Sequence, residues 1–336
     1  MATIQDVAAM AGVSVASVSR VMNNSRAVQP GTRERVERAA RELGYVPNEA
    51  ARSLKLARSM LFACVIPDVA NPFFPELVRG IEDIAISQGY GTLLCNTDND
   101  PEREAAYLNL LSQRRIDGLL MIPSRDEQAP PGLVQLLDQG SPVVIVDRFL
   151  EGFDGDSIVL DNERGGTLAA EHLIELGHRR IAIINRRPDI STARLRQKGY
   201  EDALTSAGIL DPAFVKLGSY SFDFGRDAAR RLLYVADDPP TAILAGSDVL
   251  AIAALQVAHE LDLHVPRDVS IVGFDRIAMS QLMSPPLTTV EQPMYEMARI
   301  AADLLLERAR GEREGPGRLR TLQPTFHVGA TTGPPR

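Results

Sequence analysis

Residues 3–22 read TIQDVAAMAGVSVASVSRVM and decide the fold of the N-terminal part of the chain. In the first half of this stretch apolar residues recur at helical spacing, at Ile4, Val7, Ala8 and Ala11. Thr3 and Asp6 predict a capping box at the start of that helix, and Gly12 predicts its end. Ser14 suits the N-cap of a second helix, whose inward-facing residues are expected to be Val18, Val21 and Met22. The stretch therefore predicts two short helices joined by a tight turn.

A third helix is predicted over residues 31–43, where the chain reads GTRERVERAAREL. Thr32 is its expected N-cap, and Gly44 is expected to end it. Pro47 then begins a polar segment, NEAARSLK at 48–55, which is too short to hold a helix together alone.

Two helices around such a turn have the spacing of a helix-turn-helix that reads DNA, and an ordinary αα-hairpin has the same spacing. Residues 1–60 contain nine Lys/Arg and five Asp/Glu, a net charge of +4 in a chain whose total is −8. A basic N-terminal segment in an otherwise acidic chain indicates that this segment binds a polyanion. A solvated helical surface would have the same composition, so both interpretations stay open on these grounds.

From about residue 60 onward, apolar runs alternate with amphipathic stretches of helical length. The runs lie at 61–66, 91–95, 118–122, 143–147, 157–161, 180–184, 241–245 and 269–274. Helices are expected near 75–88, 102–115, 131–139, 163–176, 192–207, 224–236, 248–262 and 293–310. This alternation predicts two doubly wound lobes with parallel sheets. Because such sheets bind ligands beyond the carboxyl ends of their strands, a cleft between the lobes would collect residues from both.

The composition limits the class of protein. Of the 336 residues, 45% are apolar and 24% are charged, which is typical of a protein with a packed core. Cys64 and Cys95 lie in apolar runs and are expected to be buried free thiols. The first residues lack the features of a secretory signal, and the apolar runs are shorter than the roughly 18 residues of a membrane span. We therefore expect a cytoplasmic protein without membrane contact.

The sequence lacks the common motifs of catalysis. It contains no P-loop, no dinucleotide-binding glycine motif and no nucleophile elbow, and its five histidines lack the spacing of metal ligands. We therefore expect neither an enzyme nor a metal site nor a cofactor. Residues 311–320 are expected to form a surface loop, with a last edge strand within 321–331.

The stretch TIQDVAAMAGVSVASVSRVMNN (3–24) resembles the N-terminal signature of the lactose-repressor (LacI/GalR) family of bacterial transcription regulators. YVPNEAARSL (45–54) resembles the hinge segment of that family, and the likeness continues in order at 67–85, 96–124, 172–184, 265–275 and 285–293. The pattern is most similar to the purine-repressor and ribose-repressor branch.

The resemblance implies an all-α helix-turn-helix head (1–46), a hinge (47–59) and an α/β core (60–336) of two doubly wound parallel-sheet lobes, like those of periplasmic binding proteins. The N-lobe would comprise about 60–161 and 293–322, and the C-lobe about 162–292 and 323–336.

The resemblance also implies contacts with a double-stranded DNA operator. In the family the start of the second helix enters the major groove, which here places Val15 and Ala16 at base edges, with Ser17 and Arg20 nearby. Val15 and Ala16 are apolar where other members carry polar pairs, so Arg20 is the expected partner of a guanine. Phosphate contacts are expected from Ser14, Ser19 and Asn23. The hinge segment contributes Asn48, Ala51, Leu54 and Lys55.

Leu54 falls where the family inserts a leucine into a base step of the minor groove, which kinks the duplex. Plain helix packing is the other interpretation of this leucine.

Seven residues fall at ligand positions of the family's inter-lobe cleft: Phe73, Phe74, Ser124, Asp147, Arg196, Ser247 and Asp275. The phenylalanines would present rings to a planar or sugar ligand, and Arg196 with the carboxylates would hold hydroxyl groups through charge-assisted hydrogen bonds. Core packing of Phe73 and capping of a strand end by Asp147 are alternative interpretations.

The leading hypothesis is a repressor that binds a palindromic operator as a homodimer and is controlled by a small molecule, with a sugar as the favoured class. One helix-turn-helix reads one half-site, so a palindrome requires two copies. The resemblance places part of the dimer interface on the helix near 75–88, and the lack of a heptad-patterned tail after 311 favours a dimer over a tetramer. The alternatives are a cytoplasmic solute-binding protein without DNA regulation and a regulator that responds to a nucleobase or nucleoside.

Overall fold

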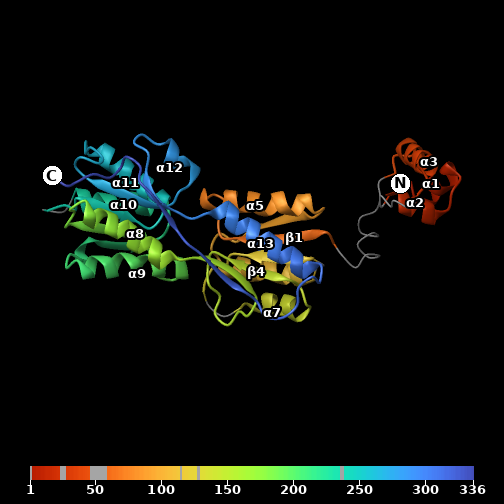
Figure 1. The fold of residues 1–336 in the computed structure, drawn as a ribbon, viewed down its shortest axis with the longest axis horizontal. Coiled ribbons are helices and arrows are strands. Elements are labelled where there is room, and N and C mark those ends of the chain that lie inside the picture. The colour runs from red at the N-terminus through yellow and green to blue at the C-terminus, as the bar shows by residue number, and fades with distance from the viewer. Residues whose placement is uncertain (1, 23–27, 46–58, 114–115, 127–128, 235–237) are drawn as a thin grey trace. The chain divides into compact units, whose positions relative to one another are not determined.

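The computed structural model describes residues 2–22, 28–45, 59–113, 116–126, 129–234 and 238–336. The chain divides into two units, Met1–Ser59 and Met60–Arg336, which are called here the head and the core (Figure 1). Each unit has its own apolar interior.

The head contains three helices, α1 (Ile4–Ala11), α2 (Val15–Met22) and α3 (Pro30–Glu42). The predicted capping box is present, because the amide and hydroxyl of Thr3 each donate to Asp6 Oδ2 at 2.8 Å. Gly12 adopts the left-handed conformation, with a φ of 64° that suits glycine, and ends α1. One apolar side chain from each helix is fully buried between them, namely Val7, Val18 and Val36. The predicted helix-turn-helix is therefore confirmed as a fold.

The start of α3 differs from the prediction. The helix begins at Pro30, with Gln29 as its N-cap, three residues before the N-cap expected at Thr32. Proline at the first helical position has its φ already set and lacks the amide hydrogen that would otherwise go unpaired. It therefore starts a helix without a polar N-cap side chain.

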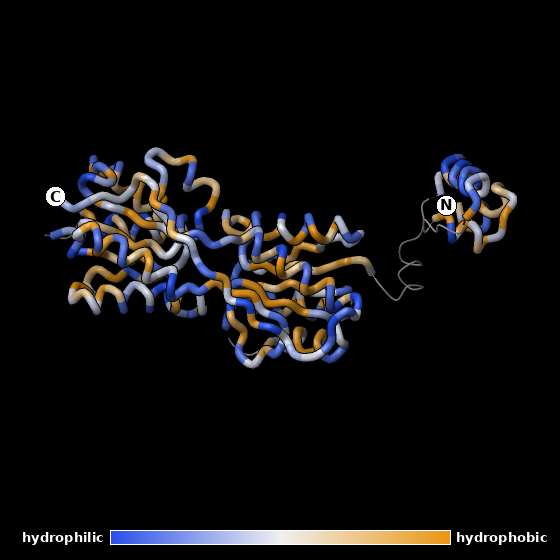
Figure 2. The backbone as a smooth tube through the Cα atoms, in the orientation of Figure 1, coloured by the Kyte–Doolittle hydropathy of each residue, from blue (hydrophilic) through white to orange (hydrophobic). Residues whose placement is uncertain are grey.

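The N-lobe of the core is built on a six-stranded parallel sheet with the order β11-β5-β4-β3-β1-β2. The strands are β1 (Leu61–Ile66), β2 (Gly91–Asn96), β3 (Gly118–Met121), β4 (Val143–Val146), β5 (Asp156–Leu160) and β11 (Leu319–Leu322). Helices α5 (Phe73–Ser87) and α13 (Met294–Ala309) cover one face, while α6 (Pro101–Gln113) and α7 (Pro131–Asp138) cover the other (Figure 1). The strands between them carry hydrophobic colours in Figure 2, as a sheet buried on both faces requires.

The C-lobe repeats this architecture around the sheet order β12-β10-β9-β8-β6-β7, in which only β12 is antiparallel to its neighbour. The strands are β6 (Ile181–Arg186), β7 (Val215–Gly218), β8 (Ala242–Ala245), β9 (Ser270–Asp275), β10 (Thr288–Glu291) and β12 (Thr325–His327). Helices α8 (Asn162–Glu175) and α9 (Ser191–Ser206) pack on one face, and α10 (Phe222–Leu233) and α11 (Asp248–Glu260) on the other. A 3-10 turn, η1 (Pro212–Phe214), precedes β7, and a short helix, α12 (Ala278–Leu282), follows β9.

The chain passes between the lobes three times: after β5 into α8, after β10 into α13, and after β11 into β12. The carboxyl ends of both parallel sheets therefore meet at these crossings, where ligands of such sheets bind.

The eight predicted apolar runs are all strands in the structure, so the predicted fold class is confirmed. Strands β7, β10 and β11 were not predicted, whereas β12 is the expected last edge strand. Cys64 and Cys95 are buried and free, as expected. Among the described helices, none is long and apolar enough to cross a membrane.

Candidate functional site

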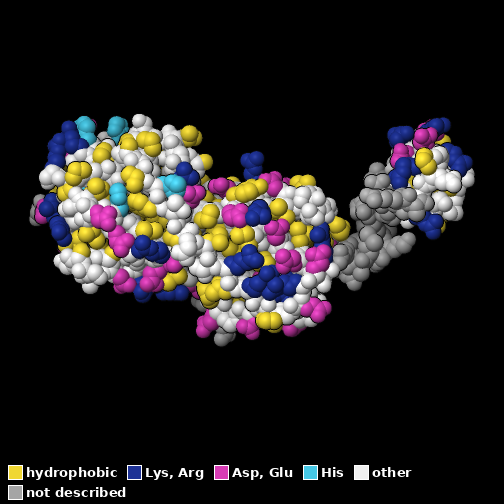
Figure 3. Space-filling model, viewed as in Figure 1, with side chains coloured by type: hydrophobic (Ala, Val, Ile, Leu, Met, Phe, Trp, Pro, Cys, Tyr) yellow, Lys and Arg dark blue, Asp and Glu magenta, His cyan; other side chains and the backbone are white. Residues whose placement is uncertain are grey.

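The exposed face of α2 is the candidate DNA-contacting surface of the head. Val15 is 41% exposed at the first position of this helix, and Ala16 and Arg20 are also exposed. The opposite face is buried through Val18 and Val21. The helical period thus separates a packing face from a face that is free to approach another molecule. Figure 3 shows Lys and Arg side chains on the described surface of the head.

Of the predicted phosphate or base contacts, Ser14 and Ser17 lie at the N-terminal end of α2 and Ser19 lies in its second turn. Ser14 Oγ accepts from the amide of Ser17 at 3.2 Å, and the two hydroxyls lie 3.0 Å apart, so Ser14 caps the helix as expected. Ser17 and Ser19 are partly exposed. The remaining predicted contacts lie outside the described residues, and these are Asn23, Asn48, Ala51, Leu54 and Lys55.

In the core, Arg196 is the centre of a buried polar cluster at the lobe boundary. Its Nε donates to Asn162 Oδ1 at 2.8 Å, and its Nη1 donates to the carbonyl oxygen of Gly246 at 2.7 Å. The guanidinium carbon lies 3.7 Å from the centroid of the Phe274 ring, in cation–π contact. Arg196 is only 3% exposed, so its orientation is fixed by these partners.

Asp275, the last residue of β9, faces Arg196, with its Oδ1 3.1 Å from Arg196 Nη1. Its φ of 108° is unusual for a residue other than glycine and turns the chain sharply beyond the strand. Burial raises the pKa of Asp275 to about 8, and the nearby carboxylates of Asp248 and Asp147 act in the same direction against the opposing charge of Arg196.

Gln292 links this cluster to the N-lobe. Its Nε2 donates to Asp147 Oδ1 at 2.6 Å, and its Oε1 accepts from Arg196 Nη2 at 2.9 Å. Asp147 directly follows β4 and Gln292 directly follows β10, so strand ends from both sheets meet here. Of the predicted residues, Asp147, Arg196 and Asp275 are therefore brought together in one network.

A second set of contacts joins the lobes beside this network. Ser191 Oγ donates to Asp126 Oδ1 at 3.1 Å and accepts from the amide of Phe149 at 2.9 Å. Arg194 also lies on α9, and its Nη2 donates to Asp126 Oδ2 at 3.3 Å. The start of α9 in the C-lobe is thus hydrogen-bonded to two N-lobe loops.

Ser124 takes part in a different interaction from the one expected. Its amide and its hydroxyl both donate to Glu104 Oε2 at 2.6 Å, so both of its donors are occupied by α6. Burial raises the pKa of Glu104, and the hydrogen bonds from Ser124 oppose that shift. The Glu104 carboxylate therefore fixes the loop after β3.

Arg148 is a central residue that the sequence analysis missed. It is 4% exposed, its Nη1 donates to the carbonyls of Pro123 and Ser124 at 2.8 and 3.2 Å, and its Nη2 donates to Asn99 Oδ1 at 3.2 Å. A charged residue directly after the buried run VVIVD is itself a signal of a strand-end site, and it could have been recognised.

Tyr220 was also missed, because it lies in a loop after an unpredicted strand. Its ring centroid is 5.9 Å from the guanidinium carbon of Arg196, and burial raises the pKa of its phenol. Three buried polar atoms of this region have no hydrogen-bond partner within the described structure, and they are Tyr220 Oη, Arg148 Nε and Asp275 Oδ1.

The remaining predicted effector residues are buried at the starts of α5 and α11. Phe73 and Phe74 begin α5, form an edge-to-face pair with centroids 4.9 Å apart, and are buried in the N-lobe interior. Ser247 is buried as the N-cap of α11, next to the Gly246 carbonyl that binds Arg196.

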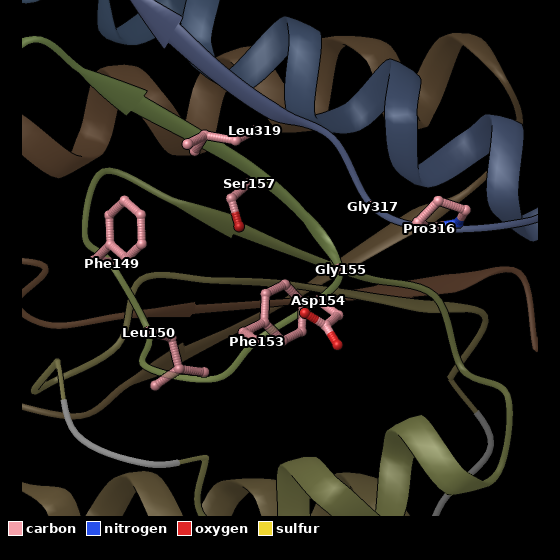
Figure 4. Close-up of a pocket in the computed structure, with 9 residues that line it drawn as sticks. All are labelled: Phe149, Leu150, Phe153, Asp154, Gly155, Ser157, Pro316, Gly317 and Leu319. Atoms are coloured by element: carbon pink, nitrogen blue, oxygen red, sulfur yellow. The ribbon is translucent and has the colours of Figure 1, made fainter.

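The core has one cavity beside the cluster and a second cavity that adjoins the first. One of about 290 Å³ is lined by Asp147, Asn162 and Ser191 as well as Phe149 and Leu319. A larger cavity of about 490 Å³ shares Phe149 and Leu319 but contains none of the predicted effector residues (Figure 4). We assign the candidate site to the polar cluster, because that is where both sets of strand ends converge. Within the described residues, no group of His, Cys, Asp and Glu has the arrangement of a metal site.

Comparison with known proteins agrees with both units. Residues 3–48 match the family described as "Bacterial regulatory proteins, lacI family", and residues 170–332 match the "Periplasmic binding protein-like domain". The ribose operon repressor of Escherichia coli (strain K12) is 40% identical over 313 residues, which cover 92% of this chain and 93% of that protein. The transcriptional repressor PurR of Aliivibrio fischeri (strain MJ11) is 37% identical over 329 residues, 96% of each protein.

Solved structures show the same likeness. The lac repressor dimer bound to operator and the anti-inducer ONPF has a TM-score of 0.87 at 29% identity, over 99% of each chain. A LacI family transcriptional regulator from Enterococcus faecium with bound ribose has a TM-score of 0.74 at 30% identity, over 82% of this chain and 99% of that one. These findings confirm the predicted family and the prediction of a regulator rather than an enzyme. The chain therefore belongs to the lacI family of bacterial regulatory proteins, as a DNA-binding repressor with a periplasmic-binding-protein-like effector domain.

Proposed function

We propose that the protein binds a palindromic operator as a homodimer and that a neutral sugar, held between the lobes of the core, controls this binding. The exposed residues at the start of α2 support the first part, because a recognition helix contacts base edges through its N-terminal residues. Val15 and Ala16 would contact thymine methyl groups, and Arg20 would pair with a guanine.

Exposed apolar side chains support the homodimer. Helix α5 packs beside β2, and these elements expose Ile86, Leu93 and Leu94 by 63%, 42% and 41%. Apolar exposure on adjoining elements marks a protein interface, and a twofold axis through it would pair two heads with two half-sites.

Three buried atoms without a hydrogen bond inside the described structure carry the proposal of a sugar, although Asp275 Oδ1 faces Arg196 Nη1 at 3.1 Å and Arg148 Nε lies 3.9 Å from Asp147. Tyr220 Oη can donate and accept, Arg148 Nε donates, and Asp275 Oδ1 accepts. A ligand that satisfies such a mixture needs groups that both donate and accept, as hydroxyls do. The terminal nitrogens of Arg148 and Arg196 already donate to protein acceptors. Neither guanidinium therefore has two free N–H groups with which to bind a phosphate. The chemistry therefore favours a neutral polyol over a phosphorylated one.

A thermal-shift screen of the full chain tests this proposal with pentoses, hexoses, sugar phosphates, nucleosides and nucleobases. A ligand at about 100 times its Kd stabilises the native state by about 2.7 kcal/mol, which gives a clear rise in Tm. We expect a free sugar to bind and its phosphate to bind more weakly. A response to nucleosides or nucleobases alone would reject the sugar in favour of the nucleobase class.

Two aspartate variants locate the binding site. Asp275→Asn is expected to reduce sugar affinity at least tenfold by weakening an acceptor in the cluster. Asp262→Asn is the matched control, because Asp262 is exposed and asparagine tolerates its φ of 56°. Equal loss of affinity in both variants would place the sugar elsewhere.

A DNA selection tests the operator. The full chain is incubated with a randomised duplex library, and the enriched sequence is titrated by fluorescence anisotropy at fixed salt, since phosphate contacts make affinity salt-dependent. We expect a palindrome, and we expect Arg20→Ala to weaken binding by about 1–3 kcal/mol. Arg231→Ala, which removes the same charge from an exposed position on the core, should change little.

A further inference from the structure

The turn that follows β9 has an unusual backbone. Asp275 has a φ of 108° and Arg276 a φ of 58°, two consecutive residues other than glycine in the left-handed half of conformational space. Such conformations are unfavourable and persist where the surrounding structure imposes them. Some interaction must therefore hold residues 275–277 in place.

Asp248 supplies that interaction from another element. It is the first residue of α11 and is fully buried. Its Oδ2 accepts from the amide of Ile277 at 2.9 Å, and its Oδ1 accepts from Thr289 Oγ1 at 2.6 Å. One carboxylate thus connects α11 with the end of the turn and with β10.

The strand beneath this carboxylate leaves room for it. A Cβ atom built on Gly273 would lie 2.2 Å from Asp248 Oδ1, which is far inside contact distance. Glycine at this position of β9 therefore lets the carboxylate lie against the strand and reach the turn.

The two ends of the turn point to different parts of the core. Asp275 pairs with Arg196 in the polar cluster. Ile277 is 1% exposed and packs within the apolar cluster of the N-lobe that includes Phe73, Phe74 and Met294. A shift of the turn would therefore move a carboxylate of the cluster and an inter-lobe apolar contact together.

We propose that Asp248 is a positioning residue: it holds the 275–277 turn so that Asp275 faces the effector cluster while Ile277 packs against the opposite lobe. The effect on the effector rests on the proposed function, but the holding of the turn does not. Asp248 acts through Asp275 and Ile277, since its own oxygens are occupied by Ile277 and Thr289.

Three variants of the full chain separate this role from general packing. Asp248→Ala removes both acceptors. Asp248→Asn keeps an acceptor for the Ile277 amide, and its new NH₂ can donate to the Thr289 hydroxyl, which can also accept. Thr289→Val is the matched control, because it removes the hydrogen bond of the carboxylate to β10 and leaves the Ile277 bond in place.

Amide hydrogen exchange, followed by mass spectrometry over peptides that span 273–283, is measured without effector. We expect Asp248→Ala to speed exchange at the turn about tenfold or more, and Asp248→Asn and Thr289→Val to leave it close to wild type. Unchanged exchange in Asp248→Ala, or equal acceleration in Thr289→Val, would overturn the proposal whether or not a sugar binds.

Titration with the sugar found in the thermal-shift screen completes the test. Asp248→Ala should weaken sugar binding about tenfold, while Asp248→Asn restores it. Faster amide exchange at the turn in Asp248→Ala, together with an unchanged sugar affinity, would overturn the proposed link between the turn and effector binding. If the wild-type chain binds no sugar, the proposed function fails, and the exchange measurement still decides the role of Asp248.

Discussion

Gln292 donates a 2.6 Å hydrogen bond to the carboxylate of Asp147, and this contact ties the segment that leaves the C-lobe sheet to the end of a central N-lobe strand. The same side chain accepts from Arg196, so one amide orients an acid of one lobe and a base of the other. A ligand that binds among these groups shifts the equilibrium between two lobe arrangements, one with this contact and one without it, only if it binds one arrangement more tightly than the other.

Replacing Gln292 by glutamate should weaken the contact between the lobes and lower the stability of the protein. The variant puts a carboxylate where an NH₂ group faces Asp147, so a buried attraction becomes a repulsion. We expect the free energy of unfolding to fall by about 1–3 kcal/mol, as for loss of a buried polar partner. Urea denaturation measures this loss, and Gln113→Glu, at an exposed helix end, serves as the control. Equal stability of Gln292→Glu and wild type would contradict the role assigned to this contact.

Arg196→Lys should be harmful although it preserves the charge. A lysine has one side-chain nitrogen, so it cannot donate hydrogen bonds to Asn162, Gly246 and Gln292 at the same time. It also lacks the planar group that stacks on the Phe274 ring. We expect a loss of about 2–4 kcal/mol in the free energy of unfolding, because buried acceptors lose their donor. Lys198→Arg, a reverse exchange at an exposed position of the same helix, should change stability by less than about 0.5 kcal/mol.

The stability of the effector-free protein should depend on pH through Asp275. Burial first, and then the neighbouring Asp248 and Asp147, raise the pKa of Asp275 to about 8 against the pull of Arg196, whereas an unfolded aspartate has a pKa of about 3.9. Between pH 4 and 8 the folded state therefore holds a proton that the unfolded state has lost. The contribution of the Asp275 proton to the free energy of unfolding is therefore complete below pH 4. It is lost progressively as the pH rises to 8.

The measurement is the free energy of unfolding from pH 6 to pH 8, with a limiting slope of about 1.4 kcal/mol per pH unit for one proton. Burial also raises the pKa of Asp248 to about 6, so its contribution ends mostly below this window. Asp275→Asn should flatten the curve, and Asp262→Asn should not. An Asp275→Asn curve parallel to wild type would assign the dependence to other groups.

Gly273→Ala should destabilise the C-lobe. The added methyl group would lie 2.2 Å from Asp248 Oδ1 and 2.7 Å from a methyl of Leu287, and both neighbours are buried. We expect a cost of about 1–3 kcal/mol, as for overpacking of a core. Gly31→Ala is the matched control, because it lies in α3 with open space around the new methyl, and there it should be neutral or stabilising. Calorimetric melting of both variants compares the two directly.

The predictions from the sequence were most accurate for strands whose local apolar composition follows directly from burial on both faces of a sheet. Runs such as VVIVD and LFACVI are apolar because parallel strands are buried on both faces, so their places could be read directly. Strand β10 begins with Thr288 and Thr289, whose buried hydroxyls pair with Thr332 and Asp248, and such pairing is invisible in the sequence. Strand β11 escaped prediction for the opposite reason, because an edge strand with exposed side chains has no apolar run.

Only part of the candidate site could likewise be predicted from the sequence. Arg196 and Asp275 could be placed by resemblance, but their pairing depends on Gln292 and on a strained turn held by Asp248, 27 residues earlier in the chain. The occupation of Ser124 by Glu104 likewise joins distant elements. Contacts of this kind arise from tertiary packing and have no local signature.

The order of the strands also has a consequence for synthesis. Strands β11 and β12 lie within nine residues of each other, and each completes an edge of a different sheet. As the chain leaves the ribosome, both lobes remain one strand short until this segment emerges. The two lobes are therefore expected to reach their final form together, once residues 319–327 have been made.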